Sequence, residues 1–381
     1  MTRCTLSDTI KLWTHEPPSL DVRQSLERLA RSFDVCRVAV MPDVHMAEDV
    51  CVGSVVATSR WIYPAAVGTD IGCGMLTARF DAEARVLDDE GTAARLLAAL
   101  RRSVPTNRQR SGEFPRQLNE ELAARPLSDR RLESIKQRDA LVQLGTLGRG
   151  NHFLEFQSDE EGRLWVLIHS GSRAVGKLVT SHHQAVAAAF GLPGLPRLDT
   201  EDQTGQNYLA DAAWAGDYAN QNRLAILATV ERVLAEMFQM QLDRSSLIHT
   251  QHNYVRSEVH EGTAYWVHRK GAQSARLGEP GIVPGSMNAA TFHVTGRGCG
   301  EALMSCSHGA GRRLSRGEAR HTISVRQFQK QVRGVHFDVR RSRGLLDEAP
   351  LVYKDIRQVM RTQRELVRIE RELQPVLGYK G

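Results

Sequence analysis

Short apolar runs that end at glycine or polar residues predict β-strands in several parts of the chain. Three runs lie close together near the start: CRVAVMPDVH (36–45), CVGSVVATS (51–59) and MLTARF (75–80). Two more follow towards the middle, HFLEFQ (152–157) and RLWVLIHSG (163–171). Short runs that are rich in valine and aromatic residues and bounded by turn residues are typical of strands.

Helical spacing predicts the elements between and after these runs. Residues 82–145 are expected to be mainly helical, with a polar loop at 105–117, and a long helix is predicted at 205–240. Strands and glycine loops alternate from 245 to 312. The segment 355–376 is predicted to be a helix, because a helix would place six apolar residues on one core-facing side. They are Ile356, Val359, Met360, Leu366, Ile369 and Leu373.

This order of elements predicts an α+β fold, in which mixed β-sheets are surrounded by helices and the active site lies at the mouths of loops. There are no internal repeats and no obvious linker, so residues 1–381 are expected to form a single catalytic domain. No βαβ unit with a GxGxxG turn is present, which argues against a dinucleotide-binding fold. The 41% hydrophobic and 25% charged residues are ordinary for a soluble globular enzyme.

Hydropathy, cysteine content and charge indicate the cellular compartment and the kind of binding partner. No apolar run approaches the roughly 20 residues that cross a membrane, and the first residues lack the features of a signal peptide. The six cysteines form no CxxC pair and are expected to be reduced thiols of a cytoplasmic protein. A net charge of +6 and a pI near 9.1 favour, weakly, a polyanionic partner such as nucleic acid or nucleotide.

The stretch VGTDIGCGML (67–76) places Asp70 and Cys73 three residues apart between glycines. Either both bind one metal ion, or Cys73 is a small buried residue and Asp70 forms a turn. Five histidines lie at the edges of strand-like segments, where rigid scaffolds display catalytic groups. They are His45, His152, His169, His252 and His308. One such histidine is more often structural, but five beside an Asp/Cys pair favour a metal site.

The donor types limit the choice of metal. Imidazole and thiolate suit zinc, iron, cobalt or manganese better than magnesium or calcium. A thiolate can bridge two cations, so Asp70, Cys73 and three histidines would suffice for a pair of ions, which can clamp the attacking and leaving oxygens in phosphoryl chemistry. The residues alone leave the identity of the metal open.

A second group of motifs suggests phosphate binding. HRKGA (268–272) is a basic turn, VPGSMNAATF (283–292) is a loop of small residues, and HGAGRRLSR (308–316) joins histidine, glycine and arginine. Arg312 and Arg316 have the spacing that would place both on one face of a helix and suit bidentate phosphate contact. A solvated basic turn and a plain turn are the alternatives for the first two motifs.

Ten of these segments, in order, resemble one known family. They are MPDVH, VGTDIGCGM, GTLGRGNHFLEF, IHSGSR, HNYVRSE, VHRKGA, VPGSM, SHGAGRRLSR, DEAPLVYKD and LGYKG. The chain is similar, from about residue 40 onward, to the RtcB family of GTP- and manganese-dependent RNA ligases. Its shorter length than archaeal and animal members fits a compact bacterial-type repair enzyme.

The resemblance implies a role for each matching residue. Asp70, Cys73 and His152 would bind one manganese ion, and Cys73, His169 and His252 a second. His308 would attack the α-phosphate of GTP. Contacts to the guanylate are implied for Asn151, Glu155, Ser286, Thr291, Gly309, Ala310, Gly311, Tyr353 and Lys380. Contacts to phosphates or RNA are implied for Arg312, Arg316, Arg269 and Lys270.

The resemblance also implies a reaction. RNA ending in a 3′-phosphate or a 2′,3′-cyclic phosphate would be joined to a 5′-hydroxyl end through a histidine–GMP intermediate and a guanylated RNA end. Cleaved tRNA or ribosomal RNA would be the substrate, and an activating protein is a further candidate partner. Two departures from the family pattern stand out. Glu48 and Asp49 follow MPDVH, and Asn288–Thr291 replaces Gly-Thr-Ala-Ser, which leaves the choice of base open.

Two other functions are also compatible with parts of this pattern. A metal-dependent phosphodiesterase could use the same ions without GTP, and a non-catalytic RNA- or ribosome-binding protein would fit the basic charge. Neither needs His308 beside a glycine-rich loop together with Lys380. These features favour the ligase.

Overall fold

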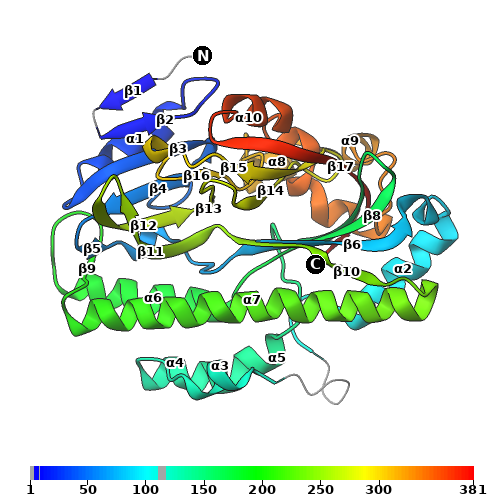
Figure 1. Cartoon of the computed structure of the whole chain (residues 1–381), viewed down its shortest axis with the longest axis horizontal. Coiled ribbons are helices and arrows are strands. Elements are labelled where there is room, and N and C mark those ends of the chain that lie inside the picture. Colours follow the sequence, from blue (N-terminus) through cyan, green and yellow to red (C-terminus); the bar gives the residue numbers. More distant parts are fainter. Residues whose placement is uncertain (1–3, 8, 110–116) are drawn as a thin grey trace.

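The computed structural model describes residues 4–7, 9–109 and 117–381. Most of the loop that was predicted at 105–117 therefore lies outside the described residues. Two large sheets dominate the architecture, and helices pack around them (Figure 1). The fold is α+β, as the alternation of strand-like and helical segments predicted.

The first sheet has six strands in the order β1-β2-β3-β4-β12-β11. Their bounds are β1 Cys4–Ser7, β2 Ile10–Leu12, β3 Val35–His45, β4 Val52–Thr58, β12 Thr263–Lys270 and β11 Asn253–His260. Neighbours are antiparallel except β2 and β3, which are parallel.

The second sheet has seven antiparallel strands in the order β10-β6-β8-β7-β17-β15-β14. Their bounds are β10 Leu242–Gln251, β6 Gly74–Glu83, β8 Arg163–Ser170, β7 Phe153–Ser158, β17 Val367–Lys380, β15 Thr291–Gly296 and β14 Pro280–Pro284. Two short ladders complete the β-structure: β13 (Ala272–Ser274) with β16 (Ser305–Ser307), and β5 (Trp61–Ile62) with β9 (Leu198–Asp199).

The helices cover the sheets. The α-helices are α1 Leu20–Ala30, α2 Glu90–Ser103, α3 Glu120–Ala124, α4 Arg130–Ile135, α5 Leu141–Gln143, α6 Arg173–Ala189, α7 Gln203–Phe238, α8 Arg316–Thr322, α9 Val325–Gln331 and α10 Ile356–Thr362. Short helices of other types are η1 Pro64–Ala66, η2 Ala84–Leu87, η3 Lys136–Ala140, η4 Gly300–Ala302, η5 Val339–Glu348 and η6 Pro350–Val352. Among the described helices, none is long and apolar enough to cross a membrane.

Helices α6 and α7 run side by side along one face of the molecule, and α3–α5 lie beyond them (Figure 1). The apolar stripe of α7 explains its position, because Ile226, Val230 and Leu234 pack in one cluster with Leu76 and Ile168 of the seven-stranded sheet. These side chains are fully or almost fully buried. The long helix predicted at 205–240 is therefore confirmed, and so are the strands predicted between residues 36 and 171.

The helix predicted over 355–376 is wrong beyond its first turns. Helix α10 ends at Thr362, and the chain then forms β17, which pairs with β15 on one side and β7 on the other. Residues 373, 375 and 377 are buried with the two-residue period of a strand, whereas Ile369, assigned to a helical core face, is 48% exposed. The need for a strand between β15 and β7 overrides the local helical pattern.

Candidate active site

The predicted metal ligands converge because of strand register in the seven-stranded sheet. Gly74, at the start of β6, pairs with Ser170 at the end of β8 and with Gln251 at the end of β10. Phe153, at the start of β7, pairs with His169. The residues beside these positions therefore meet at one end of the sheet; they are Cys73, His152, His169 and His252.

The donor atoms lie at the separations expected around a metal ion. Cys73 Sγ is 3.4 Å from His152 Nε2 and 3.3 Å from His169 Nε2, and His169 Nε2 is 3.4 Å from His252 Nε2. Metal–sulfur and metal–nitrogen bonds of ordinary length at tetrahedral angles separate donors by about 3.4–3.6 Å. Cys73, His152 and His169 form a buried group that could hold an ion, and His252 adjoins it.

Asp70 completes the donor set. Its Oδ2 lies 2.8 Å from His152 Nε2, and its buried Oδ1 has no hydrogen-bond partner among the described residues. Burial alone would raise the pKa of Asp70, but the neighbouring His152 outweighs it and lowers the pKa to about 2. An ionised carboxylate with an unpaired buried oxygen fits a metal ligand.

The ionisation of Cys73, His169 and His252 also suits metal binding. Burial raises the pKa of the Cys73 thiol well above its usual value, and the nearby Asp70 charge raises it further. Such a thiol stays protonated unless a cation stabilises the thiolate. Burial lowers the pKa of His169 and His252 well below the usual value, which keeps both imidazoles neutral and able to donate a lone pair.

Arg223 of α7 ties the ligand-bearing segments together. Its Nη1 donates to the backbone oxygens of Gly72 at 2.8 Å and Ser170 at 2.7 Å, and its Nε donates to His249 Nε2 at 2.8 Å. Each acceptor lies within three residues of a metal donor in sequence. The guanidinium is fully buried, and burial lowers its pKa to about 10.

His308 stands beside this donor group. Its ring centroid is 4.7 Å from that of His252, and its Nδ1 lies 2.7 Å from Oδ2 of the buried Asp43 in β3. A carboxylate oxygen accepts, so Nδ1 carries the proton and Nε2 keeps a free lone pair. Gly311 allows this approach: it has a φ of +74°, and a Cβ there would lie 2.1 Å from the Asp43 carbonyl oxygen.

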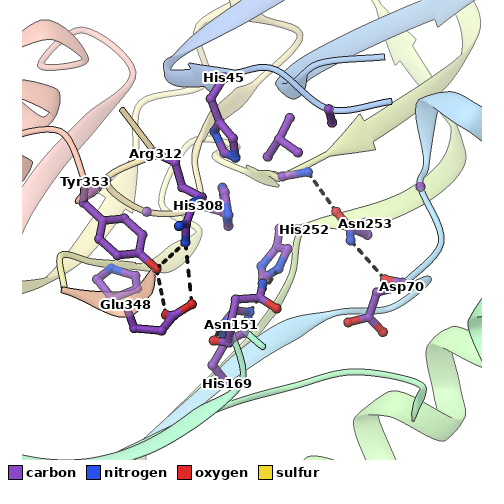
Figure 2. A pocket seen from close by; sticks show the side chains of 18 of the residues that line it. His45, Asp70, Asn151, His169, His252, Asn253, His308, Arg312, Glu348 and Tyr353 are labelled. Carbon is purple, nitrogen blue, oxygen red and sulfur yellow. Dashed lines mark hydrogen bonds and ion pairs between the residues drawn. The ribbon is translucent and has the colours of Figure 1, made fainter. Parts of the chain in front are cut away.

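A cavity of about 970 Å³ opens in front of His308. Figure 2 shows the labelled histidines 308, 252 and 169 across it, with Tyr353 and Glu348 on one side and Asp70 on the other. The cavity is lined by most of the residues for which the resemblance implies a role. These are Asp70, Asn151, Glu155, His169, His252, Lys270, Ser286, Thr291, His308, Gly309, Ala310, Gly311, Arg312, Arg316, Tyr353 and Lys380. Of the other histidines, His45 also lines the cavity.

Glu348 organises one side of the cavity. Its carboxylate accepts from Tyr353 Oη at 2.8 Å, Arg316 Nη1 at 2.8 Å and Lys380 Nζ at 2.5 Å. Burial would raise the pKa of Glu348, but Lys380 and Arg316 outweigh it and lower the pKa. The guanidinium of Arg312 lies 5.2 Å from the centre of the Tyr353 ring, and Figure 2 shows these groups linked. The network fixes an aromatic ring and three cations around one carboxylate.

Glu155 lies on the floor of the same cavity. Gln157 Nε2 donates at 2.7 Å both to Glu155 Oε1 and to Thr291 Oγ1, so one amide joins β7 to β15. Burial raises the pKa of Glu155 to about 8, although Gln157 and Lys380 lower it in part. A carboxyl group that titrates near neutral pH inside a cavity is typical of a binding or catalytic site.

The sequence matches one protein family, described as "tRNA-splicing ligase RtcB", over residues 25–127 and 116–381. The chain belongs to the RtcB family.

Individual RtcB proteins are similar over nearly their whole length. The "RNA-splicing ligase RtcB" of Escherichia coli K12 is 36% identical over 402 residues, which cover 98% of this chain and 97% of that protein. The "RNA-splicing ligase RtcB1" of a second E. coli strain matches equally well. The RtcB of Mycobacterium tuberculosis H37Rv is 29% identical over 425 residues, with 90% of this chain and 96% of that protein covered. The RtcB resemblance of the sequence is confirmed.

Two expectations from the sequence need correction. Arg269 does not line the cavity: it is fully buried in β12, where it pairs with Glu258 and donates to Ser305 Oγ at 3.0 Å. Its side chain alternates with that of Lys270, which does reach the cavity. Arg312 and Arg316 do not share a helix either, because α8 begins only at Arg316. Both arginines instead form ion pairs with Glu348.

Sequence reasoning missed three residues that organise this RtcB site. Asp43 lies in MPDVH and Glu348 in DEAPLVYKD, both of which were noted as family motifs without a role for the acid. An acidic residue inside an apolar strand was the available signal for Asp43, because a buried carboxylate needs a partner. Arg223 offered a similar signal, as an arginine within the apolar part of a long helix.

Proposed function

We propose that this RtcB protein is a GTP-dependent RNA ligase that joins a 3′-phosphate or 2′,3′-cyclic phosphate end to a 5′-hydroxyl end. The observation that supports this most is the Asp43–His308 pair, which presents a free imidazole nitrogen to a large cavity beside a metal-donor group. A phosphodiesterase that relies on metal ions alone has no use for such a nucleophile.

The proposed reaction begins at His308. Its Nε2 lone pair attacks the α-phosphorus of GTP, the bond to the β-phosphate oxygen breaks, and pyrophosphate leaves. Asp43 holds the Nδ1 proton and stabilises the positive charge that develops on the ring. Arg312, Arg316 and Lys270 lie at the cavity surface where they can offset phosphate charge.

Two manganese ions fit the donor set, one at Asp70, Cys73 and His152 and the other at Cys73, His169 and His252. When bound, they would supply positive charge beside the reacting phosphate. The guanine would lie against Tyr353, within reach of Glu155, Ser286 and Lys380. Contacts of Asn151, Thr291 and the 309–311 backbone with the nucleotide are part of the same proposal.

The remaining steps transfer GMP from His308 to an RNA 3′-phosphate, after which a 5′-hydroxyl attacks that end and GMP leaves. A cyclic phosphate end would first be hydrolysed to the 3′-phosphate. The RNA substrates would be cleaved tRNA or ribosomal RNA, and an activating protein would be a further partner.

Labelling with GTP tests the proposal. The protein is incubated with α-³²P-GTP and manganese and analysed by denaturing electrophoresis, alongside His308→Ala. We expect an acid-labile, base-stable label on the unmodified protein and none on the variant. Label that persists in His308→Ala, or an unmodified protein that binds manganese and never takes up label, would contradict a histidine–GMP mechanism.

A further inference from the structure

The basic charge of the chain is concentrated in one segment next to the active site. Residues 312–343 contain ten Lys or Arg residues and two acidic ones, a net charge of +8, whereas the whole chain carries +6. All other residues together therefore carry −2. The segment begins four residues after His308 and contains α8, α9 and the first half of η5. We call it the basic lobe.

The basic lobe displays its charge to solvent. Three of its cations, Arg312, Arg316 and Arg320, form ion pairs with Asp347 or Glu348. Six others are exposed and form no ion pair with any described residue. They are Arg313, Arg326, Lys330, Arg333, Arg341 and Arg343.

Three of these cations form a stripe along helix α9 and just beyond its end. Arg326 and Lys330 are one helical turn apart, and Arg333 follows just after the helix ends. Phe328, which points the other way, is fully buried in the core of the lobe. Because Phe328 anchors the opposite side of the helix in the core of the lobe, the stripe faces solvent.

Hydrogen bonds attach the lobe to two segments that border the cavity, the loop at 284–287 and strand β17. The Asn288 amide, next to the 284–287 loop, donates to the backbone oxygens of Gln331 at 2.8 Å and Arg333 at 3.3 Å. His336 exchanges backbone hydrogen bonds with Val376 and Gly378 of β17, the strand that ends at Lys380. Asn288 is one of the departures from the family pattern, and here it fixes the position of the lobe.

We infer that the basic lobe is a docking surface for the phosphodiester backbone of RNA whose end reacts at His308. This inference rests on the ligase function proposed above and adds to it the path of the substrate strand. The cavity continues to the lobe at Arg312, Ser315 and Arg316, so a strand that leaves the cavity there meets the exposed cations directly.

The composition of the lobe favours contact with the backbone over contact with bases. Arginine and lysine side chains bind phosphates through charge and release counterions from the nucleic acid. Every residue of the lobe is described by the structure, and no Phe, Tyr or Trp side chain in it is exposed for stacking on a base. We expect binding that depends strongly on salt and little on sequence.

A triple variant, Arg326→Gln, Lys330→Gln and Arg333→Gln, tests the inference. The probe is a fluorescent single-stranded RNA with a 3′-phosphate, and its affinity is measured by anisotropy at several salt concentrations. We expect the affinity to fall about tenfold and the slope of log K against log salt to become shallower by about 2, as three phosphate contacts are lost. Labelling of His308 by GTP should be unchanged.

Matched variants separate the possible explanations. Arg23→Gln, Arg28→Gln and Arg31→Gln remove the same charge from exposed positions in and after α1, outside the basic lobe, and should retain RNA affinity. Arg341→Gln with Arg343→Gln should weaken binding independently. RNA affinity and salt slope equal to those of the unmodified protein in both lobe variants would overturn the docking surface, even if ligation occurs. Failure of the unmodified protein to form the GMP adduct would instead refute the ligase proposal.

Discussion

At the scale of single residues, the Asp43–His308 pair decides which ring nitrogen can react. An asparagine at position 43 could donate to Nδ1 and so favour the tautomer in which Nε2 carries the proton. The fold would tolerate the change because the side chains have the same shape. The site would keep its nucleotide contacts but lose its nucleophile.

We therefore expect Asp43→Asn to slow formation of the GMP adduct at least about 100-fold. The rate is measured with labelled GTP, and GTP affinity is measured separately by equilibrium dialysis. Asp211→Asn is a matched control, because Asp211 is a buried carboxylate that lies 2.7 Å from His183. That variant should lose stability while its folded fraction reacts at the normal rate. Equal rates for Asp43→Asn and the unmodified protein would exclude the orienting role.

The raised pKa of Glu155 predicts that the stability of the protein depends on pH. Its pKa is raised to about 8 in the folded protein, chiefly by burial, and is near 4.3 when unfolded. Its contribution to stability is thus fully present below about pH 4.3 and is lost as pH rises through about 8. Between pH 5 and 9, we expect the free energy of unfolding to fall by about 4 kcal/mol more in the unmodified protein than in Glu155→Gln.

Chemical denaturation of the nucleotide-free proteins at pH 5, 7 and 9 measures this difference. Glu160→Gln serves as the control, because Glu160 is more exposed and its variant should follow the unmodified protein. Parallel curves for Glu155→Gln and the unmodified protein would show that Glu155 is ionised across the range.

At the scale of elements, Arg223 links α7 to three ligand-bearing segments of the sheet. Lysine would keep the positive charge but could not reach all the acceptors that the guanidinium fork reaches. We expect Arg223→Lys to lower manganese affinity about tenfold, because Gly72 and Ser170 would no longer be held together. Isothermal titration of the metal-free protein with Mn²⁺ gives the affinity directly.

Arg269→Lys provides the comparison for Arg223→Lys. Arg269 is equally buried, but its hydrogen bonds go to Glu258, Ser305 and the backbone of Leu303, none of which adjoins a metal donor in sequence. Its replacement should lower the melting temperature and leave manganese affinity of the folded protein unchanged. If both variants lose affinity alike, the effect of Arg223 is one of general stability.

Elements of the fold differ in how far the sequence predicts them. The strands at 36–45 and 163–171 and helix α7 were predictable, because each has a local apolar run or stripe that is buried in a hydrophobic core. Strand β17 was not, since its identity depends on β15 and β7, which are distant in sequence. Family motifs located the residues of the cavity, but Asp43 gains its role only when β3 meets the 309–311 loop.

At the scale of the whole molecule, metal binding should appear as added stability. A ligand that binds only the folded state stabilises it by about 2.7 kcal/mol at a concentration of 100 times Kd. For a chain of this size, we expect Mn²⁺ to raise the melting temperature by about 3 °C. Cys73→Ala removes the donor shared by both proposed ions and should abolish the rise. A full shift in Cys73→Ala, with normal metal content by elemental analysis, would rule out the bridging role.

The spread of the metal donors along the chain has a consequence for the order of events in folding. They come from positions 70 to 252, and the strands that carry them must find register across long loops before the donors meet. Contacts between distant segments form slowly. Small zinc domains, with ligands close in sequence, gain metal and structure together. Here the ions would bind to a sheet that has already folded. A chelator should therefore remove the ions while the sheet stays folded.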